Sequence, residues 1–165
     1  MTSGEALRRV ALLHCFTDEE LQSLTKLGKV SDFEPYSNII IEGELTWGIY
    51  FLMDGLVEVV RSNNLDGVNY QVAQLVPGAF FGELSLIDSN PRSATVRAMT
   101  PVKAMCIEKS EFESFLNQST ERKIRFMQHA LTLIASRLRE VDENFIVAQH
   151  QLWSRALQKE SKRAA

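Results

Sequence analysis

Hydrophobic and polar positions along this chain change their period twice, and each change predicts a different kind of structure. Near the start, Leu7, Val10, Ala11, Leu13 and His14 fall at helical spacing. The first segment is therefore expected to be helical.

The next segment carries a local signal for a second helix. Thr17 and Glu20 match a capping box, in which the hydroxyl and the carboxylate satisfy free amides at a helix start. Gly28 is expected to end this helix. Its apolar face consists of Leu21, Leu24 and Leu27.

From Lys29 to Glu108 the period is two, with turn residues about every eight to twelve positions. Such short, evenly spaced strands favour an antiparallel barrel or sandwich. The candidate strands are 29–34, 38–42, 48–53, 56–62, 69–76, 94–100 and 102–108.

One interruption differs from the other turns. Residues 80–88, followed by the loop 89–93, are typical of a single helical turn inserted between two strands. Unpaired amides at the start of such a turn suit an anion.

After residue 113 the chain is expected to be helical to near Lys159, and its apolar positions form a heptad seam. A helix over 121–157 would be about 55 Å long at 1.5 Å per residue, which exceeds a small barrel. We expect a parallel homodimer through residues 127–152; packing on the chain's own barrel explains only the first turns. The seam consists of Met127, Leu131, Ile134, Leu138, Val141, Phe145, Ala148 and Leu152.

Composition narrows the class of protein. A chain of 165 residues that is 45% hydrophobic and 24% charged is typical of a globular domain, and no apolar run is long enough for a membrane. The start lacks a signal-peptide pattern, so a cytoplasmic location is expected. Cys15 and Cys106 lie in apolar stretches and are interpreted as reduced core residues.

Charge is distributed unevenly. Residues 1–120 hold nine Lys/Arg and sixteen Asp/Glu, whereas residues 121–165 hold nine and five. The basic C-terminal quarter is interpreted as a solvated helix face, because no nucleic-acid reading motif accompanies it. We therefore expect neither nucleic acid nor membrane as a partner.

The inserted segment also carries candidate chemistry. Gly82 lets the backbone approach a ligand closely, and Arg92 presents a planar fork for two phosphate oxygens. Ser93 adds a hydroxyl and an amide, and Glu83 could accept from sugar hydroxyls while balancing Arg92. Together these residues suggest a sugar phosphate; the alternative is a surface turn with an ordinary Glu–Arg pair.

Residues 81–87 and 91–96 closely resemble the phosphate-binding cassette of cyclic-nucleotide-binding domains, such as those of catabolite activators and protein kinase A regulatory subunits. Residues 39–44, 49–52, 55 and 57–59 resemble the barrel signature of the same family. The resemblance covers about residues 5–145.

The resemblance implies a fold and a site. The fold is mostly β with flanking helices: an eight-stranded antiparallel β-roll (jelly-roll-like) with a short phosphate-binding helix, then a long C-terminal helix. Arg92 would pair with the cyclic phosphate and Glu83 with the ribose 2′-OH, while the amides of Ser85 and Ser93 bind phosphate oxygens. Gly82 would lie against the sugar. The full predicted ligand-binding set is Phe81, Gly82, Glu83, Leu84, Ser85, Arg92, Ser93, Ala94 and Asp142.

Asp142 bears on the choice of purine. It lies about where family members place the residue that caps the base, and a carboxylate there could accept two bonds from guanine but one from adenine. The competing use of Asp142 is an interhelical pair with Arg137. We expect cAMP, with cGMP as the alternative ligand, and no metal.

The predicted organisation is a binding domain with N-terminal helices over 1–118 and a capping and dimerising helix over 119–165. In catabolite-activator relatives a helix-turn-helix follows, but only residues 158–165 follow here, so an unknown partner or output domain is expected. No catalytic triad, metal cluster or triphosphate loop is found, so an enzyme is not expected. The alternatives are a dimerisation module of the same fold that ignores nucleotides, and a regulatory fragment of a transcription factor or signalling enzyme.

Overall fold

The computed structural model describes residues 3–46, 48–62, 67–84 and 90–163. The chain divides into two compact units, Met1–Phe126 and Met127–Ala165. The helix α5 (Thr120–Arg163) contributes its first turns to the first unit and the rest to the second. No helix within the described ranges is both long and apolar enough to cross a membrane.

The N-terminal segment folds as two short pieces instead of the single helix predicted from its spacing. Helix α1 (Ser3–Arg8) ends before an extended Val10, and a 3-10 turn, η1 (Ala11–Leu13), follows. Because the chain breaks there, the neighbouring residues Leu12 and Leu13 are both buried. Burial in the core overrides the helical pattern in this segment.

The capping box is confirmed at the start of α2 (Asp18–Leu27). The Thr17 hydroxyl accepts from the Glu20 amide at 3.3 Å, and the Glu20 carboxylate accepts from the Thr17 amide at 2.9 Å. Gly28 ends the helix with an extended φ of −80° and not a left-handed one. Glycine is needed there for space, because a Cβ would lie 2.3 Å from Sδ of Met105.

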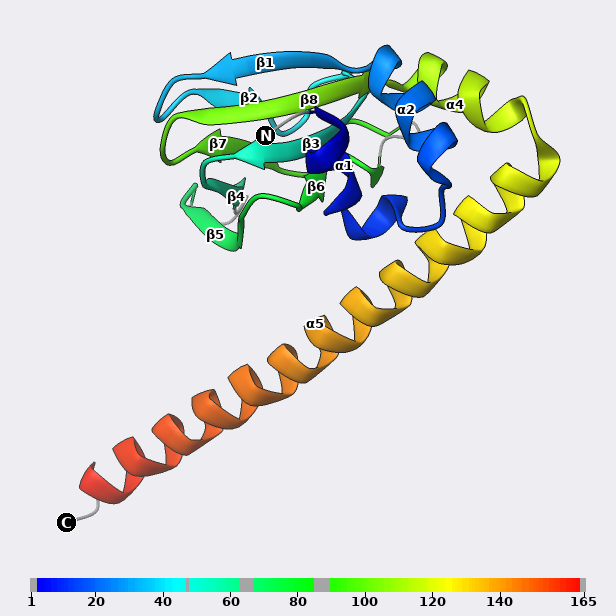
Figure 1. Cartoon of the computed structure of the whole chain (residues 1–165). Helices are drawn as coiled ribbons and strands as arrows, with labels where there is room; N and C mark the ends of the chain where they lie inside the picture. The colour runs from blue at the N-terminus through cyan, green and yellow to red at the C-terminus, as the bar shows by residue number, and fades with distance from the viewer. Residues whose placement is uncertain (1–2, 47, 63–66, 85–89, 164–165) are drawn as a thin grey trace. The chain divides into compact units, whose positions relative to one another are not determined.

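Eight antiparallel strands in the described residues form two four-stranded sheets, as predicted (Figure 1). The first sheet has the order β1-β8-β3-β6 and the second the order β2-β7-β4-β5. The strands are β1 (Lys29–Phe33), β2 (Asn38–Ile40), β3 (Gly48–Asp54), β4 (Val57–Ser62), β5 (Asn69–Leu75), β6 (Phe80–Phe81), β7 (Thr95–Ala98) and β8 (Val102–Glu108).

The core lies between the two sheets. Its cluster of buried side chains combines Leu52, Phe81 and Ala104 from the first sheet with Ile40, Val57 and Val96 from the second. Strand β5, at an edge, is mostly exposed on both faces. Strand β7 buries every second residue, as a strand with one face on the core does, whereas β3 is buried along most of its length and β1 is mostly exposed.

Strand β6 was not predicted, because its two phenylalanines were assigned to the inserted helical turn. Phe81 pairs with Tyr50 and Phe80 with Phe51 of β3, and both phenylalanines are buried. Two consecutive buried residues carry no alternation from which a strand could be recognised. Of the predicted helical turn, Leu84 has helical geometry, and residues 85–89 lie outside the described ranges.

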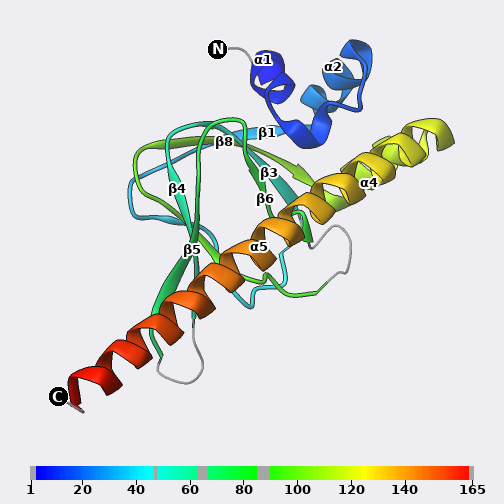
Figure 2. The ribbon, with the colours of Figure 1, turned by 90° about the horizontal axis from the view of Figure 1, so that it is seen from below.

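The continuous helix predicted after residue 113 is interrupted. Helix α4 (Lys109–Asn117) ends before α5 begins, and the Ser119 hydroxyl accepts from the Arg122 amide at 3.2 Å, as a helix cap does. The helices α1, α2 and α4 gather beside one end of the strands (Figure 2). The predicted functional boundary at residues 118/119 stays a prediction.

The N-terminal helices and the start of α5 share an aromatic and ionic cluster. Phe16 stacks on Phe126 with ring centroids 5.8 Å apart. The Glu20 carboxylate accepts from Arg122 at 3.0 Å and from Arg125 at 2.6 Å. The same carboxylate that caps α2 therefore also anchors the first turns of α5.

Candidate ligand-binding site

Arg92 is the centre of the predicted site, and it is buried, with only 5% of its surface exposed. Its backbone is fixed to the turn after β2: its amide donates to Glu44 at 2.9 Å, and its carbonyl accepts from Gly43 at 2.9 Å. The short loop before β7 is thus held against the loop before β3.

Hydrogen bonds to Thr46, Gly82 and Gly48 hold the Arg92 guanidinium group. Nε donates to the Thr46 hydroxyl, Nη1 to the Gly82 carbonyl and Nη2 to the Gly48 carbonyl, each at 3.0 Å. These bonds come from the ends of β6 and β3 and from the loop between β2 and β3. A guanidinium tied at three points loses little further freedom when it binds an anion.

The electrostatics of this position favour an anion. Burial lowers the pKa of the Arg92 guanidinium, although the nearby Tyr50, Cys106 and Glu83 act to raise it. Arginine nevertheless stays protonated in proteins. The other buried charged residue in the described chain, Glu58, is bonded to Arg97 Nε at 2.7 Å. A buried guanidinium in a loop between strands offers a positive charge and donors that suit a phosphate group.

Gly82 lies directly against this guanidinium. Its φ is +80°, and a Cβ there would meet Arg92 Nη1 at 2.6 Å and the Gly48 carbonyl oxygen at 2.9 Å. Glycine is therefore required both for the left-handed backbone and for the close approach. Phe81, one residue earlier, is buried and stacks on Tyr50 with centroids 5.2 Å apart.

The structure therefore brings three of the predicted site residues together: Phe81, Gly82 and Arg92. Glu83 follows Gly82, is partly buried, and exerts its charge on Arg92. The remaining predicted residues are less constrained: Ser93 is exposed, Ala94 is partly buried, and Leu84 is 47% exposed.

Two predicted residues are not located relative to this cluster. Ser85 lies outside the described residues. Asp142 is exposed on α5 and belongs to the second unit, Met127–Ala165. Its proposed position over the base stays a prediction.

Sequence reasoning missed the residues that hold the arginine. Thr46 and Gly48 precede or begin β3, more than forty positions before Arg92. A glycine at the start of a strand pattern often marks a close approach of backbone, and Gly48 carried that signal. Thr46 carried none, because a threonine before a strand is common.

Tyr50 is a second missed member of this region. Burial and a hydrogen bond with Cys106 raise the pKa of its hydroxyl to about 12, so the phenol is neutral near pH 7. Its ring, stacked on Phe81, fixes β6 against β3. Tyr50 thereby fixes the strand that ends at Gly82.

The second unit contributes an apolar stripe along α5. Leu131, Leu138, Val141 and Phe145 are each at least 60% exposed. Met127 and Ile134 belong to the same predicted seam and are 53% and 38% exposed. The Leu152 side chain lies outside the described part of the chain. A stripe of this kind is a candidate contact surface.

The sequence matches a described family and several of its members. A family model described as the cyclic nucleotide-binding domain matches residues 30–119. A CRP-like cAMP-activated global transcriptional regulator of Mycobacterium tuberculosis is 26% identical over 140 residues, which are 85% of this chain and 60% of the regulator. A cyclic nucleotide-gated potassium channel of Mesorhizobium japonicum is 36% identical over 83 residues, which are 50% of this chain and 21% of the channel.

Among solved structures, the catabolite activator protein of Thermus thermophilus superposes with a TM-score of 0.72 at 25% identity. The superposition covers 84% of this chain and 63% of that protein. The chain thus spans less than two thirds of the length of each of these three proteins.

Proposed function

Because this chain belongs to the cyclic nucleotide-binding domain family, as its cassette predicted, we propose that it is a regulatory module that binds cAMP and relays binding to a partner or output domain. The observation that carries this proposal is the buried Arg92 guanidinium, held by Thr46, Gly48 and Gly82. The proteins it matches are regulators and a channel. The module acts by binding and not by catalysis.

The roles proposed for the individual residues are those that the resemblance to the family implies. Arg92 pairs with the cyclic phosphate, and Gly82 gives the sugar room to approach. Glu83, next to Gly82, accepts from the ribose 2′-OH. The Ser93 amide, directly after Arg92, and the Ser85 amide bind phosphate oxygens. Phe81, Leu84 and Ala94 complete the contact surface. The ligand needs no metal in this scheme, because Arg92 supplies the positive charge.

The choice of purine rests on the matched regulator and on Asp142. The regulator matched over most of this chain is named for cAMP, which favours cAMP over cGMP. Asp142 would favour guanine if it lies over the base, because a carboxylate can accept from N1–H and the amino group together. We therefore propose cAMP as the ligand, with cGMP as the alternative.

The relay is proposed to use a parallel homodimer. The exposed stripe of Leu131, Leu138, Val141 and Phe145 falls at heptad spacing and would be buried between two copies of α5. The first turns of α5 are anchored to α2 through Glu20. A helix that is anchored at one end and paired along the rest can transmit a change in the binding domain.

The alternative proposal keeps the dimer and removes the ligand: a module of this fold that associates through α5 without binding nucleotide. The exposed stripe supports it equally well. Titration with cAMP and cGMP separates the two proposals, because a dimerisation module would give no heat with either nucleotide.

The test compares wild type, Arg92→Ala and Arg61→Ala by titration calorimetry. Removing one partner of a buried charge pair costs about 2–5 kcal/mol, so Arg92→Ala should lose at least about thirtyfold in affinity. Arg61 is an arginine on β4 of the same barrel with a 62% exposed side chain, and its replacement should change affinity little. Equal affinities of the three proteins would refute the site, and a circular dichroism melt would show that Arg92→Ala still folds.

A further inference from the structure

Thr46 lies in the loop between β2 and β3, outside the set of residues that the family resemblance assigns to the ligand. Its hydroxyl accepts a hydrogen bond from Arg92 Nε at 3.0 Å. The other two partners described above, Gly82 and Gly48, accept through backbone carbonyls. A change of side chain at position 46 can therefore alter one contact of the guanidinium without removing the two carbonyls.

The loop that carries Thr46 also holds the backbone of Arg92. The Arg92 amide donates to the Glu44 carbonyl, and the Gly43 amide donates to the Arg92 carbonyl, each at 2.9 Å. The backbone and the side chain of the arginine are thus bonded to one short stretch of chain, residues 43–46. The direction of the guanidinium therefore depends on this loop as well as on the cassette.

The chemistry of threonine suits a residue that orients another side chain. Threonine is β-branched, so its χ1 angle is restricted and its hydroxyl points in few directions. An arginine side chain has many rotamers, and ordering such a side chain at the moment of binding weakens affinity about two- to twelvefold. When Thr46 holds Nε in the free protein, part of this ordering precedes the arrival of the ligand.

Burial makes the hydroxyl difficult to replace. Arg92 is only 5% exposed, so water has little access to its donors. A buried donor that loses its acceptor is unfavourable, and the guanidinium would then turn toward other acceptors. The carboxylates of Glu83 and Glu44 already act on the charge of Arg92. Loss of the Thr46 hydroxyl is therefore expected to redirect the guanidinium.

We propose that Thr46 is a positioning residue of the nucleotide site, whose hydroxyl orients the Arg92 guanidinium toward the cyclic phosphate from outside the cassette. This inference rests on the proposed function, because it concerns affinity for the same ligand. It adds a residue whose effect on binding passes through Arg92 and disappears when Arg92 is replaced.

The experiment is a double-mutant cycle, titrated with cAMP and in parallel with cGMP by calorimetry, and by NMR shift titration for weakly binding variants. Thr46→Val replaces the hydroxyl with a methyl group and should weaken binding about three- to tenfold. Thr46→Ser keeps the hydroxyl and should stay within about twofold of wild type. In an Arg92→Ala background, Thr46→Val should change affinity less than about twofold, because residues that act through one contact are not additive. Thr46→Ala is a second variant without the hydroxyl, should Thr46→Val be unstable.

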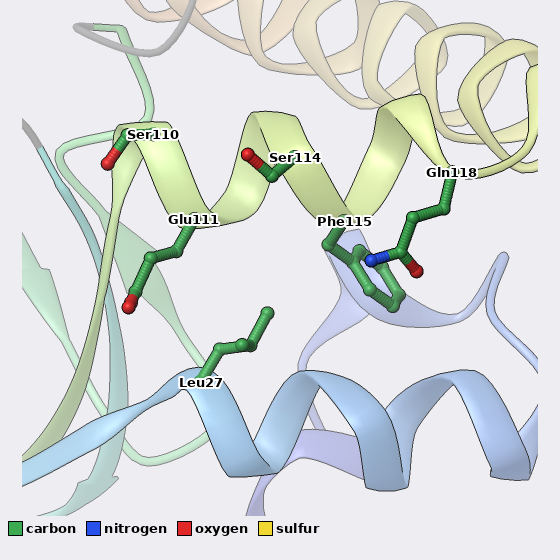
Figure 3. A pocket seen from close by; sticks show the side chains of 6 residues that line it. All are labelled: Leu27, Ser110, Glu111, Ser114, Phe115 and Gln118. Carbon is green, nitrogen blue, oxygen red and sulfur yellow. The ribbon is translucent and has the colours of Figure 1, made fainter.

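Thr100→Val and Ser114→Ala are the controls. The Thr100 hydroxyl accepts from the Leu56 amide at 2.9 Å, but Thr100 follows β7 whereas Arg92 precedes it. Ser114 lies on α4 and lines a hollow between α2 and α4 (Figure 3), and none of the residues that line this hollow belongs to the predicted ligand-binding set. Both variants should bind within about twofold of wild type.

The outcomes separate this inference from the proposed function. A wild type that binds neither nucleotide would overturn both. If wild type binds and Arg92→Ala does so far more weakly, but Thr46→Val binds as well as Thr100→Val, only the role of Thr46 is overturned. Equal losses from Thr46→Val with and without Arg92, or a Thr46→Ser variant as weak as Thr46→Val, would also overturn it, because the hydroxyl would then support the loop and not the arginine.

Discussion

Replacing Gly82 with alanine tests whether the close approach of β6 to Arg92 organises the site. The new Cβ would lie 2.6 Å from Arg92 Nη1, 2.9 Å from the Gly48 carbonyl oxygen and 3.2 Å from Ile40 Cδ1. The guanidinium could retreat only by giving up its 3.0 Å bond to the Gly82 carbonyl. The carbonyl of Gly48 belongs to a strand and cannot retreat easily.

The loss of stability expected for Gly82→Ala has two contributions. An alanine at φ +80° pays about 1–2 kcal/mol for the left-handed conformation. Overpacking a filled interior adds about 1–3 kcal/mol. Gly82→Ala should therefore lower the free energy of unfolding by about 2–5 kcal/mol, and it should weaken cAMP binding because Arg92 must move.

A matched control variant separates the backbone strain from the overpacking. Gly67 has φ +68°, and a Cβ at this position would meet no atom within 4 Å, so Gly67→Ala carries the backbone strain without the clash. Urea denaturation with linear extrapolation measures both variants. If Gly82→Ala is no more destabilising than Gly67→Ala, and binds cAMP as wild type does, the packing of Gly82 against Arg92 is not what shapes the site.

Three further predictions concern the rest of the molecule. Glu20→Gln should cost about 1–3 kcal/mol at pH 7, because two arginines lose their carboxylate. Burial acts to raise the pKa of Glu20, but bonds from Thr17, Arg122 and Arg125 outweigh it and lower the pKa. The stabilisation is thus present above the unfolded value near 4.3 and is lost as pH falls through the lower folded value, so urea unfolding should show the variants converging in acid. Leu138→Asp with Phe145→Asp should give monomers by light scattering; a wild type that is itself monomeric would contradict the dimer. The difference in tyrosinate absorbance between wild type and Tyr50→Phe should titrate near pH 12, and a midpoint near 10 would mean that the phenol is solvated.

Features that depend on neighbouring residues could be predicted from the sequence. The capping box of Thr17 and Glu20 needs only three residues of separation, and the structure contains both of its bonds. The strands whose alternation reflects one buried face were predicted within a few residues. Residue chemistry and the family resemblance both placed Gly82 and Arg92 in one candidate site, but their direct contact was not predicted, because ten positions and a loop separate them.

Features set by distant contacts could not be predicted in this way. Thr46 and Gly48 hold Arg92 only because the turn at Gly43 and Glu44 binds the Arg92 backbone. The break at residues 118–119 does have a local signal, because Ser119 is a typical helix cap and accepts from the Arg122 amide, but the heptad pattern alone predicts one continuous helix. The ion pairs of Glu20 with Arg122 and Arg125 form because α5 packs against α2, and no local sequence pattern encodes that contact.

The partners of Arg92 bear on how the site can work as a sensor. Nη1 and Nη2 donate to the backbone carbonyls of Gly82 and Gly48, which are neutral acceptors. A phosphate carries a negative charge, so it attracts the guanidinium more strongly than these two carbonyls do. Because those carbonyls belong to Gly48 at the start of β3 and Gly82 at the end of β6, any movement of the guanidinium toward phosphate changes contacts on two strands at once. The bonds that orient Arg92 thus connect phosphate binding to the strands of the barrel.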